Sequence, residues 1–415
     1  MPAGRYAGGA ELVAAELAEN LARSGTDVVL VSDVEPKSRQ QMSANVSIAE
    51  IGTYRGPRRY IKLIPVAFPR WLAQHLLGNI LAARRARSVL KSDDEGFDLV
   101  HVHGALAAIL LRRAMRTHAK STPLVYTEHD ATPWSCRYRS TLERLVRRYV
   151  YRQVNLRACR AATVVTVAFP PLADELAART GLSRSHFALV KNGLAVEWLS
   201  RQRDANSVKV VHGLDRYVLF VGTLVPRKCP DVLLRALTNV SLPCIFVGDG
   251  PMRASLERLA AKYEIADRVV FTGAVHNRTL HCYYSGAEAL VLPSVSEAVP
   301  LAAIEALGAG VPVVASNLLG FASFVRDREN GLLVEPGDEA SLTRALYALE
   351  TDESLRARLR RGAESSSRAV ESWPKVASQL CTLWEQHKRG DTLTVQGPVL
   401  HLPPAAAIPE GQAHD

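Results

Sequence analysis

Two glutamates, Glu297 and Glu305, lie eight residues apart in the segment LPSVSEAVPLAAIEALGAGVPVVAS (292–316). Pro300 lies between them and suits the first position of a helix, where its missing N–H costs nothing. A helix that begins there points free N–H groups and a positive dipole end outward, which makes an anion site. Glu305, over one turn in, could then reach hydroxyls of a phosphate-bearing ligand. Two solvated surface glutamates are the alternative, but Glu305 interrupts an apolar helix, and a buried acid needs a partner.

A pair of cations, Arg227 and Lys228, follows the apolar run that ends at Gly222. We expect this pair to open a helix, where two positive charges oppose the helix dipole and do not serve helix stability. The pair suits a diphosphate instead, because Arg makes a forked contact and Lys adds a point charge. A solvated basic corner is the alternative.

Histidines end two further apolar runs: His101 and His103 in HVHGA, and His129 in YTEHD. Open α/β sheets place ligands at such strand ends. His129 beside Asp130 could act as an imidazole held near a carboxylate. A structural histidine with satisfied hydrogen bonds is the alternative for each. The GGAE segment at 8–11 allows close approach of the backbone to a ligand, although a plain turn explains it equally well.

Several other chemistries lack their motifs. GDGPMR (248–253) begins like the nicotinamide-binding G-x-G-x-x-G, but Arg253 replaces the third glycine and no acidic residue follows convincingly. The sequence has no D-x-D, G-x-S-x-G or Walker A motif, so a metal-held site of the D-x-D kind lacks support. The 6 Cys lie far apart without a C-x-x-C pair, which argues against disulfides or cysteine-rich zinc and fits a reducing cytosol.

The elements that must position these residues alternate between strands and helices. Continuous Val- and Ile-rich runs predict strands buried on both faces of a parallel sheet, at 27–32, 98–103, 123–128, 163–167, 217–222, 243–248, 268–273, 289–293 and 311–316. Amphipathic runs predict helices, among them 11–25, 229–240, 252–263, 302–310 and those from 338 to 389. This alternation, repeated twice, predicts two doubly wound α/β domains.

Composition and charge limit the class of protein. The chain has 415 residues, of which 47% are hydrophobic and 22% charged, so wholesale disorder is not expected. We find no apolar run long enough to span a membrane and no secretory leader. Residues 1–200 hold 28 Lys and Arg against 17 Asp and Glu, whereas residues 201–415 hold 23 against 24. The basic first half favours an anionic partner: a membrane surface, a phosphate-bearing substrate or nucleic acid.

Two basic stretches, 68–91 and 137–160, combine arginines with aromatic and aliphatic residues. Solvated helix faces are one interpretation. Docking on an anionic bilayer is another, because such residues suit the headgroup layer. Nucleic-acid binding is disfavoured, since no reader motif accompanies the charge.

Taken together, the chain resembles the family 4 retaining glycosyltransferases of the GT-B fold, from about residue 7 to about residue 388. The matching segments are GGAE (8–11), YTEHD (126–130), KNG (191–193), GTLVPRK (222–228), VGDGP (247–251), FTGAV (271–275) and the Glu-x7-Glu segment 297–305. The resemblance implies two Rossmann-like domains that face each other across a cleft. It also implies transfer of a sugar from a nucleotide-sugar to an acceptor, with retained anomeric configuration and without metal or other cofactor.

The resemblance implies a role for each donor-side residue. Arg227 and Lys228 neutralise the donor diphosphate, helped by backbone N–H groups near Leu301. Glu305 holds the ribose hydroxyls, and Glu297 lies at the donor sugar. Stabilisation of the leaving diphosphate would be the main catalytic effect.

The remaining roles concern the acceptor and the base. His129 and Gly9 line the cleft from the acceptor side, and Ala274 and Val275 lie near the base. The reaction implied is a front-face displacement, in which the leaving phosphate takes the acceptor proton and no protein nucleophile is needed. Domain closure would exclude water and limit hydrolysis of the donor.

We expect an acceptor-side domain at 1–195 and a nucleotide-sugar-binding domain at 196–371. A helix at 372–390 should pack back towards the first domain, and 391–415 should form a disordered tail. The enzyme would be cytoplasmic and peripheral on the membrane. Its acceptor would be a lipid-linked or cell-envelope glycan, with no nucleic-acid partner.

Three departures from the family pattern stand out. Cys229 and Ala298 occupy positions where glycine is common, and both are small enough to be tolerated. Met1 falls in the loop that should follow the family's first strand. Either the true start lies upstream of Met1, or the first-domain sheet lacks that strand and has unpaired edges. The alternative function is therefore a catalytically weak sugar-nucleotide-binding or scaffold protein with a truncated first domain.

Overall fold

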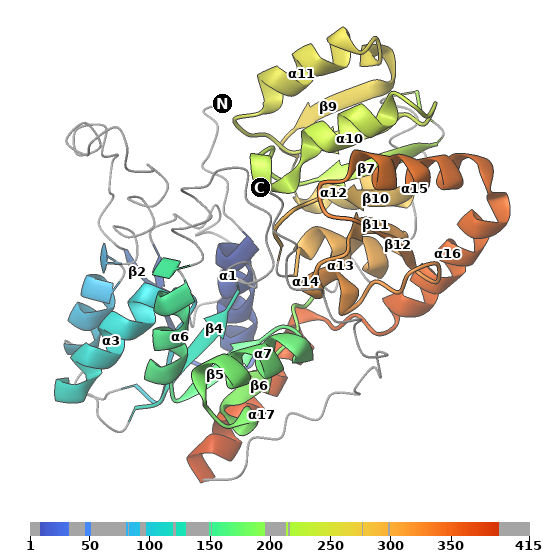
Figure 1. Cartoon of the computed structure of the whole chain (residues 1–415). Coiled ribbons are helices and arrows are strands. Elements are labelled where there is room, and N and C mark those ends of the chain that lie inside the picture. The colour runs from blue at the N-terminus through green and yellow to red at the C-terminus, as the bar shows by residue number, and fades with distance from the viewer. Residues whose placement is uncertain are drawn as a thin grey trace, which may run out of the picture.

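The computed structural model describes residues 9–32, 46–50, 80–81, 83–91, 97–118, 122–129, 149–150, 152–195, 213–214, 216–275, 277–297 and 299–389. Its chain forms two parallel-sheet α/β domains, the doubly wound architecture that the sequence predicts (Figure 1).

The first domain contains α1 (Gly9–Arg23), β1 (Val28–Ser32), β2 (Val46–Glu50), β3 (Val100–Val102), α3 (Ala105–His118), β4 (Leu124–Glu128), α6 (Arg152–Ala161), β5 (Val164–Val167), α7 (Pro170–Thr180), the 3₁₀ turn η4 (Arg184–His186) and β6 (Phe187–Leu189). Strands β3, β4, β5 and β6 form one parallel sheet in that order, while β1 and β2 pair in a separate parallel sheet. The expectation that a first strand is missing stays a prediction.

The second domain contains β7 (Tyr217–Val221), η5 (Pro226–Lys228), α10 (Pro230–Leu237), β8 (Cys244–Val247), α11 (Arg253–Lys262), η6 (Ala266–Arg268), β9 (Val269–Gly273), α12 (Asn277–Ser285), β10 (Ala287–Leu292), α13 (Leu301–Gly308), β11 (Val313–Ser316), α14 (Leu319–Ala322), β12 (Gly331–Val334), α15 (Glu339–Thr351) and α16 (Glu353–Ser367). Its six strands are parallel, in the order β12-β11-β10-β7-β8-β9. The chain runs outward from β7 through β8 to β9, and then from β10 outward to β12. The switch point therefore lies between β7 and β10, where open sheets of this kind bind ligands at the carboxyl ends of the strands.

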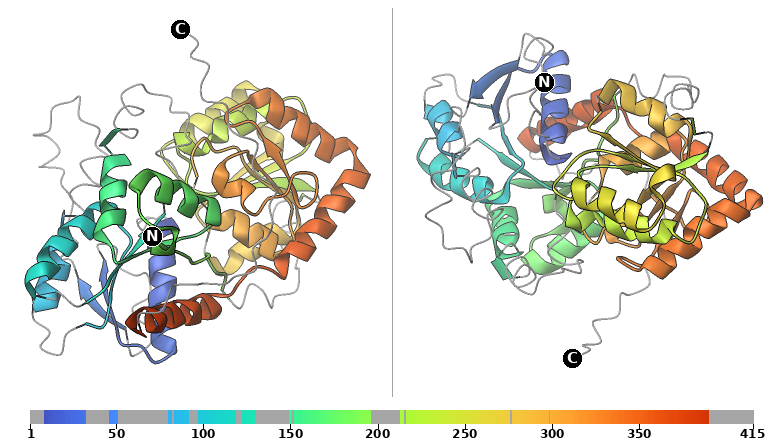
Figure 2. Two further views of the ribbon diagram at one scale, coloured as in Figure 1. Left: turned by 60° about the horizontal axis from the view of Figure 1, so that its bottom comes forward. Right: turned by 90° about the horizontal axis from the view of Figure 1, so that it is seen from above.

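The last helix, α17 (Trp373–Arg389), returns to the first domain and packs against α1 (Figures 1 and 2). Val13 and Leu17 of α1 share a buried apolar cluster with Val376 and Leu380 of α17 and with residues of β4, β5 and β6. Burial of such side chains stabilises by roughly 2 kcal/mol each. This packing ties the end of the chain to the first sheet.

The chain passes between the domains twice, near Leu194 and near residues 371–373, and these two crossings are hydrogen-bonded to each other. Leu194 N–H donates to Glu371 O at 2.8 Å, and Trp373 N–H donates to Leu194 O at 3.0 Å. Gly193 has no room for a side chain, because a Cβ there would lie 2.8 Å from the backbone nitrogen of Trp373. The glycine thus allows the two crossings to pass in close contact.

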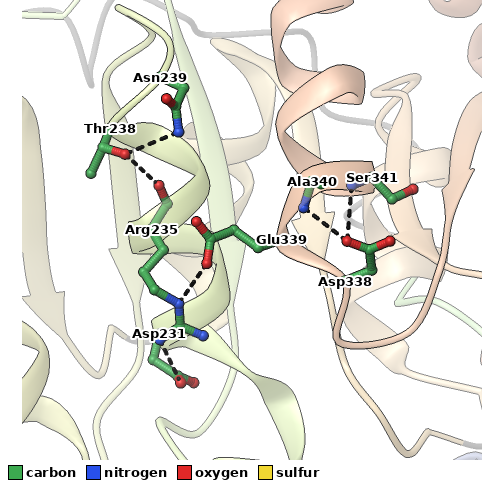
Figure 3. A network of polar contacts seen from close by, with 8 residues as sticks. All are labelled: Asp231, Arg235, Thr238, Asn239, Asp338, Glu339, Ala340 and Ser341. Carbon is green, nitrogen blue, oxygen red and sulfur yellow. Dashed lines mark hydrogen bonds and ion pairs between the residues drawn. The ribbon is translucent and has the colours of Figure 1, made fainter.

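A polar network fixes α10, the helix that follows Arg227 and Lys228 (Figure 3). Arg235 pairs with Asp231 on its own helix at 3.2 Å and with Glu339 of α15 at 2.8 Å. Asp338 caps α15 by accepting from the backbone N–H groups of Ala340 and Ser341. These ion pairs fix α10 against α15 and so help to hold the turn that contains Arg227 and Lys228.

The nine expected strands are all present, with ends that differ by one or two residues. Three strands were not expected: β2, β6 and β12. The predicted tail (391–415) and most of the stretches 68–91 and 137–160 lie outside the described residues. Among the residues that the structure describes, no helix has the length and apolar character needed to cross a membrane.

Candidate functional site

The cation pair and the first glutamate meet at the switch point of the second sheet. Arg227 and Lys228 follow β7, Glu297 follows β10, and these two strands are neighbours. Lys228 Nζ lies 2.8 Å from Glu297 Oε1, and Arg227 Nη1 lies 3.6 Å from Glu297 Oε2. The two loops are also joined through their backbones, since Val295 N–H donates to Arg227 O at 2.9 Å.

The local backbone explains how Lys228 reaches this position. The pair lies in the 3₁₀ turn η5 and precedes α10, so the expectation that it opens the helix is wrong by a few residues. Gly222 leaves room for the lysine stem, because a Cβ there would lie 3.1 to 3.3 Å from its Nζ, Cε and Cδ atoms. Cys229 adopts φ 49°, a left-handed conformation that glycine accepts more easily. The position of Lys228 therefore depends on the lack of a side chain at Gly222 and on the left-handed backbone at Cys229.

The electrostatics of Glu297 reflect a buried charge with nearby cations. Only 8% of Glu297 is exposed. Burial alone would raise its pKa, but the charges of Lys228 and Arg227 and hydrogen bonds from Lys228 and Ser294 lower that pKa below its ordinary value. Glu297 is thus held as a carboxylate, and half of the Arg227 side chain stays exposed to solvent. The arrangement offers a cationic surface that an external anion can contact.

The second glutamate has the opposite environment. Glu305 lies in the second turn of α13, is 8% exposed, and accepts a hydrogen bond from the Tyr284 hydroxyl at 2.8 Å. Burial raises its pKa to about 7, and the bond from Tyr284 lowers it only in part. Helix α13 begins at Leu301, with Pro300 as the residue before its first turn, so Pro300 is not the first helical position expected from the sequence.

Three histidines form a stacked group at the ends of β3 and β4. The rings of His101 and His103 stack with centroids 4.5 Å apart, and those of His103 and His129 stack at 5.0 Å. His103 Nδ1 lies 2.7 Å from His129 Nε2, and His101 Nε2 lies 2.6 Å from Thr127 Oγ1. Burial lowers the pKa of His129 to about 4, and burial together with the His129 charge lowers that of His101 to about 3. The group is neutral at pH 7.

Two adjoining pockets lie between the domains. The first is lined by Glu128, His129, Lys191 and Asn192 of the first domain and by Val299 of the second. Asn192 also donates to Val299 O at 3.4 Å.

The second pocket is lined by Leu12 and Glu16 of α1, by the crossing residues 193–195, and by Leu301 and Glu305. Trp373 lines both pockets. Val299 lines the first pocket, and Leu301 and Glu305 line the second, so the start of α13 faces the first domain at both pockets.

The other expected site residues are placed less closely. Gly9 is the first described residue and begins α1, whose side chains line both pockets. Ala274 and Val275 follow β9, at the same edge of the sheet as Arg227. Because β9 is two strands from β7, they lie roughly 10 Å further along that edge. Asp130 and Ala298 lie outside the described residues.

Sequence reasoning missed two residues and one contact at the site. Tyr284, which contacts Glu305, follows another tyrosine, and nothing in the sequence distinguishes the two. The partner of His129 is His103 of the neighbouring strand, which adjacent parallel strands could have suggested. Trp373 lines both pockets from the second crossing. Among the described residues, no group of three or more His, Cys, Asp or Glu side chains could hold a metal ion.

Two family models match the chain one after the other. The model "Glycosyltransferase Family 4" matches residues 7–198, and "Glycosyl transferases group 1" matches residues 202–366. The fold is the GT-B architecture, two Rossmann-like domains with pockets between them. The chain belongs to the family 4 glycosyltransferases.

Relatives with known names agree with this family. An uncharacterised glycosyltransferase of Methanocaldococcus jannaschii is 23% identical over 92% of this chain and 95% of its own length. The D-inositol 3-phosphate glycosyltransferase of Streptomyces avermitilis is 31% identical over 52% of this chain and 51% of its own length. The match to the second relative therefore spans about half of that protein.

Solved structures share the fold. Sucrose-phosphate synthase from Thermosynechococcus elongatus superposes with a TM-score of 0.75 at 22% identity, over 93% of this chain and 95% of its own. The Anabaena protein HepE in complex with UDP-glucose gives a TM-score of 0.68 at 18% identity, over 92% and 97% of the two chains.

Proposed function

We propose that this glycosyltransferase transfers a sugar from a nucleotide-sugar donor to a lipid-linked or cell-envelope glycan acceptor, with retention of the anomeric configuration and without metal. The observation that carries the proposal is the meeting of Arg227, Lys228 and Glu297 at the switch point of the second sheet. The HepE structure holds UDP-glucose on the same fold.

The donor diphosphate would bind Arg227 and Lys228. The half-exposed Arg227 offers a forked donor, and Lys228 adds a charge that Glu297 holds in place in the unliganded protein. The N–H groups at the start of α13, near Leu301, would add the positive end of a helix dipole. These groups would stabilise the charge that develops on the leaving diphosphate.

The remaining donor contacts follow from the order of the strands. Glu305 would accept hydrogen bonds from the ribose, and Glu297 would lie at the sugar. Ala274 and Val275, further along the sheet edge, would lie near the base. A nucleotide extended along the carboxyl ends of the strands matches this spacing.

The acceptor would enter from the first domain, past His129 and Gly9. In the front-face displacement, the bond between the anomeric carbon and the diphosphate oxygen breaks, and the acceptor oxygen bonds to that carbon on the same face. The acceptor proton passes to the leaving phosphate oxygen. The lowered pKa of His129, which burial causes, suits it to a neutral hydrogen-bonding role rather than a charged one.

A donor panel tests this proposal. We expect the protein to bind and slowly hydrolyse one class among UDP-, GDP- and ADP-sugars, with the released sugar showing the donor's anomeric configuration by NMR, and EDTA having no effect. The double variant Arg227→Ala with Lys228→Ala should lose binding. Its control is Arg344→Ala with Arg361→Ala, which removes two exposed charges elsewhere in the same domain. This control variant should keep its donor binding.

Other results of the donor panel would contradict particular parts of the proposal. Retained turnover in the double variant would remove the diphosphate role. Inversion in the product or inhibition by EDTA would refute retention or metal independence. Binding without hydrolysis or transfer to extracted envelope acceptors would favour the alternative of a catalytically weak scaffold. No binding by the folded protein to any of the three classes would overturn the proposed donor.

A basic face of the first domain supports the proposal of a peripheral membrane location. The helical residues 83–91 and helices α3 and α6 contain no Asp or Glu, and all three contribute to one apolar cluster. Helices α3 and α6 lie side by side (Figure 1). The exposed cations of these three helical segments are Arg84, Arg85, Arg87, Lys91, Arg113, Arg116, Arg157 and Arg160. Such a surface is attracted to anionic lipid by about 1 kcal/mol for each basic residue close to the membrane.

Vesicle sedimentation tests this location. The protein should bind phosphatidylglycerol vesicles and not phosphatidylcholine vesicles, with release as the salt concentration rises. Arg113→Gln with Arg116→Gln should weaken binding, whereas Arg344→Gln with Arg361→Gln should not. Equal binding by both double variants would contradict the assignment of this face.

A further inference from the structure

A buried tyrosine reaches the glutamate that is proposed to hold the donor ribose. Tyr284 comes from the last turn of α12, has no exposed surface, and donates its hydroxyl hydrogen to Glu305 Oε2 at 2.8 Å. The same hydroxyl lies 3.2 Å from Ala302 O. One hydrogen cannot serve both acceptors fully, and the nearer, ionisable oxygen makes the stronger bond.

The elements around Glu305 include α16, which packs against α13, and α1, which lines the second pocket. Helix α16 buries Leu355, Leu359 and Ala363. From α1, Glu16 lines the same pocket as Glu305, and it is the only other ionisable side chain among the described residues that line this pocket. Among the described residues, no cation contributes to the shifted pKa of Glu305. The Tyr284 hydroxyl therefore provides the polar contact that orients this carboxyl group.

We propose that Tyr284 is a positioning residue for donor binding: its hydroxyl fixes one oxygen of Glu305 and leaves the other oxygen to accept the ribose hydroxyls. This inference rests on the proposed ribose-binding role of Glu305. Tyr284 itself does not touch the donor. It acts by fixing the rotamer of a side chain that lines the cleft.

The same bond influences the charge of Glu305. Burial raises the pKa of Glu305, and the Tyr284 bond opposes that rise. Without the hydroxyl, the pKa of Glu305 rises further, and more of it is protonated at neutral pH. A protonated acid has lost an acceptor site, so ribose binding weakens most below neutral pH.

The chain offers a matched control in Tyr217. It is also a buried tyrosine, at the start of β7, and its hydroxyl donates to Tyr283 O of α12 at 2.7 Å. Tyr217→Phe loses one buried hydrogen bond, as Tyr284→Phe does, but has no bond to Glu305. The two variants therefore separate loss of stability from loss of positioning.

The experiment measures affinities for UDP, GDP and ADP and for their 2′-deoxy and 3′-deoxy counterparts by titration calorimetry. Tyr284→Phe should bind the preferred ribonucleotide about tenfold more weakly, the value of one hydrogen bond to a charged group. Its affinity for the deoxy form that lacks the recognised hydroxyl should hardly change, so discrimination falls. Tyr217→Phe should keep the wild-type discrimination.

A double variant and the pH dependence complete the test. In a Glu305→Gln background, Tyr284→Phe should have little further effect on nucleotide affinity, because the carboxylate proposed to accept the ribose hydroxyls is gone. Raising the pH from 6 to 9 should reduce the difference in ribonucleotide affinity between Tyr284→Phe and wild type. The nucleotide's own titration is common to both proteins and cancels in the comparison.

The outcomes separate the inference from the function on which it rests. If Glu305→Gln leaves every affinity unchanged, the ribose-binding role fails. If Glu305→Gln weakens binding and Tyr284→Phe does not, only the inference fails. If Tyr284→Phe weakens ribonucleotides and deoxynucleotides equally at every pH, Tyr284 is merely structural and the inference is overturned.

Discussion

Glu305→Gln should stabilise the unliganded protein at pH 8 and do so much less at pH 5. Glu305 is 8% exposed, and burial raises its pKa from an ordinary 4.5 to about 7. The amide of glutamine carries no charge at any pH, while its oxygen can still accept the Tyr284 hydrogen bond. The variant therefore removes the cost of a buried charge with little change in shape.

The sign and size follow from proton linkage. Below pH 4.5 the acid is protonated in both the folded and unfolded states and has no pH-dependent effect. As the pH rises towards 7, the folded state holds the proton more tightly than the unfolded state, so stability falls. At 1.36 kcal/mol per pKa unit, the full cost is about 3 kcal/mol above pH 7. Between pH 5 and pH 8 the stabilising effect of the variant should grow by about 2 kcal/mol.

Urea denaturation of both proteins at a series of pH values measures this difference. Any cost of burying the NH2 group that replaces a carboxyl oxygen is the same at each pH and drops out of the comparison. Glu353→Gln, at the exposed first residue of α16, controls for the loss of one negative charge. NMR of carboxyl-labelled glutamate should show one signal that titrates near pH 7 and disappears in Glu305→Gln.

A constant stability difference between pH 5 and pH 8 would refute the reasoning. So would a carboxyl signal for Glu305 that titrates near its ordinary pH. Either result would mean that water reaches this carboxyl group more freely than its exposed fraction indicates.

Three further predictions concern other parts of the chain. Lys228→Met should cost about 3 kcal/mol of stability, because Glu297 stays buried with Arg227 and the Ser294 hydroxyl as its remaining described partners; a urea midpoint that does not move would contradict this. His129 should remain neutral at pH 6, since burial lowers its pKa to about 4, and imidazole ¹⁵N shifts report the charge directly. Glu264→Gly should stabilise by up to about 1 kcal/mol, because this exposed residue adopts φ 57° after α11; a lower urea midpoint would contradict it.

Much of the fold follows from the sequence because buried parallel strands carry their own signal. The runs that became β7, β8 and β11 are continuous and apolar, and they are buried along their length. The strand β6 has three residues and forms by pairing with β5, so its own pattern carries little information. The short β12 was missed for the same reason: pairing with β11 defines it.

The site was predictable in its charges and not in its contacts. The spacing of Glu297 and Glu305 pointed to two roles around a helix start, and the structure brings Glu297 to Arg227 and Lys228. Which of the adjacent tyrosines faces Glu305 depends on how α12 packs against the second sheet, a tertiary property. Exact ends also escaped prediction: the cation pair lies before α10 because Cys229 turns the chain there.

The two glutamates of one short segment have opposite electrostatic environments. Both are about equally buried, yet the nearby cations lower the pKa of Glu297, while Glu305, with only a neutral hydroxyl, has a raised pKa. If a diphosphate binds Arg227 and Lys228 as proposed, it must compete with Glu297 for the same charges. On this proposal, the unliganded protein keeps its cations ordered at the cost of weaker donor binding. Glu297→Gln should on this argument bind the free nucleoside diphosphate more tightly than wild type; weaker binding would show that Glu297 organises the cations more than it competes for them.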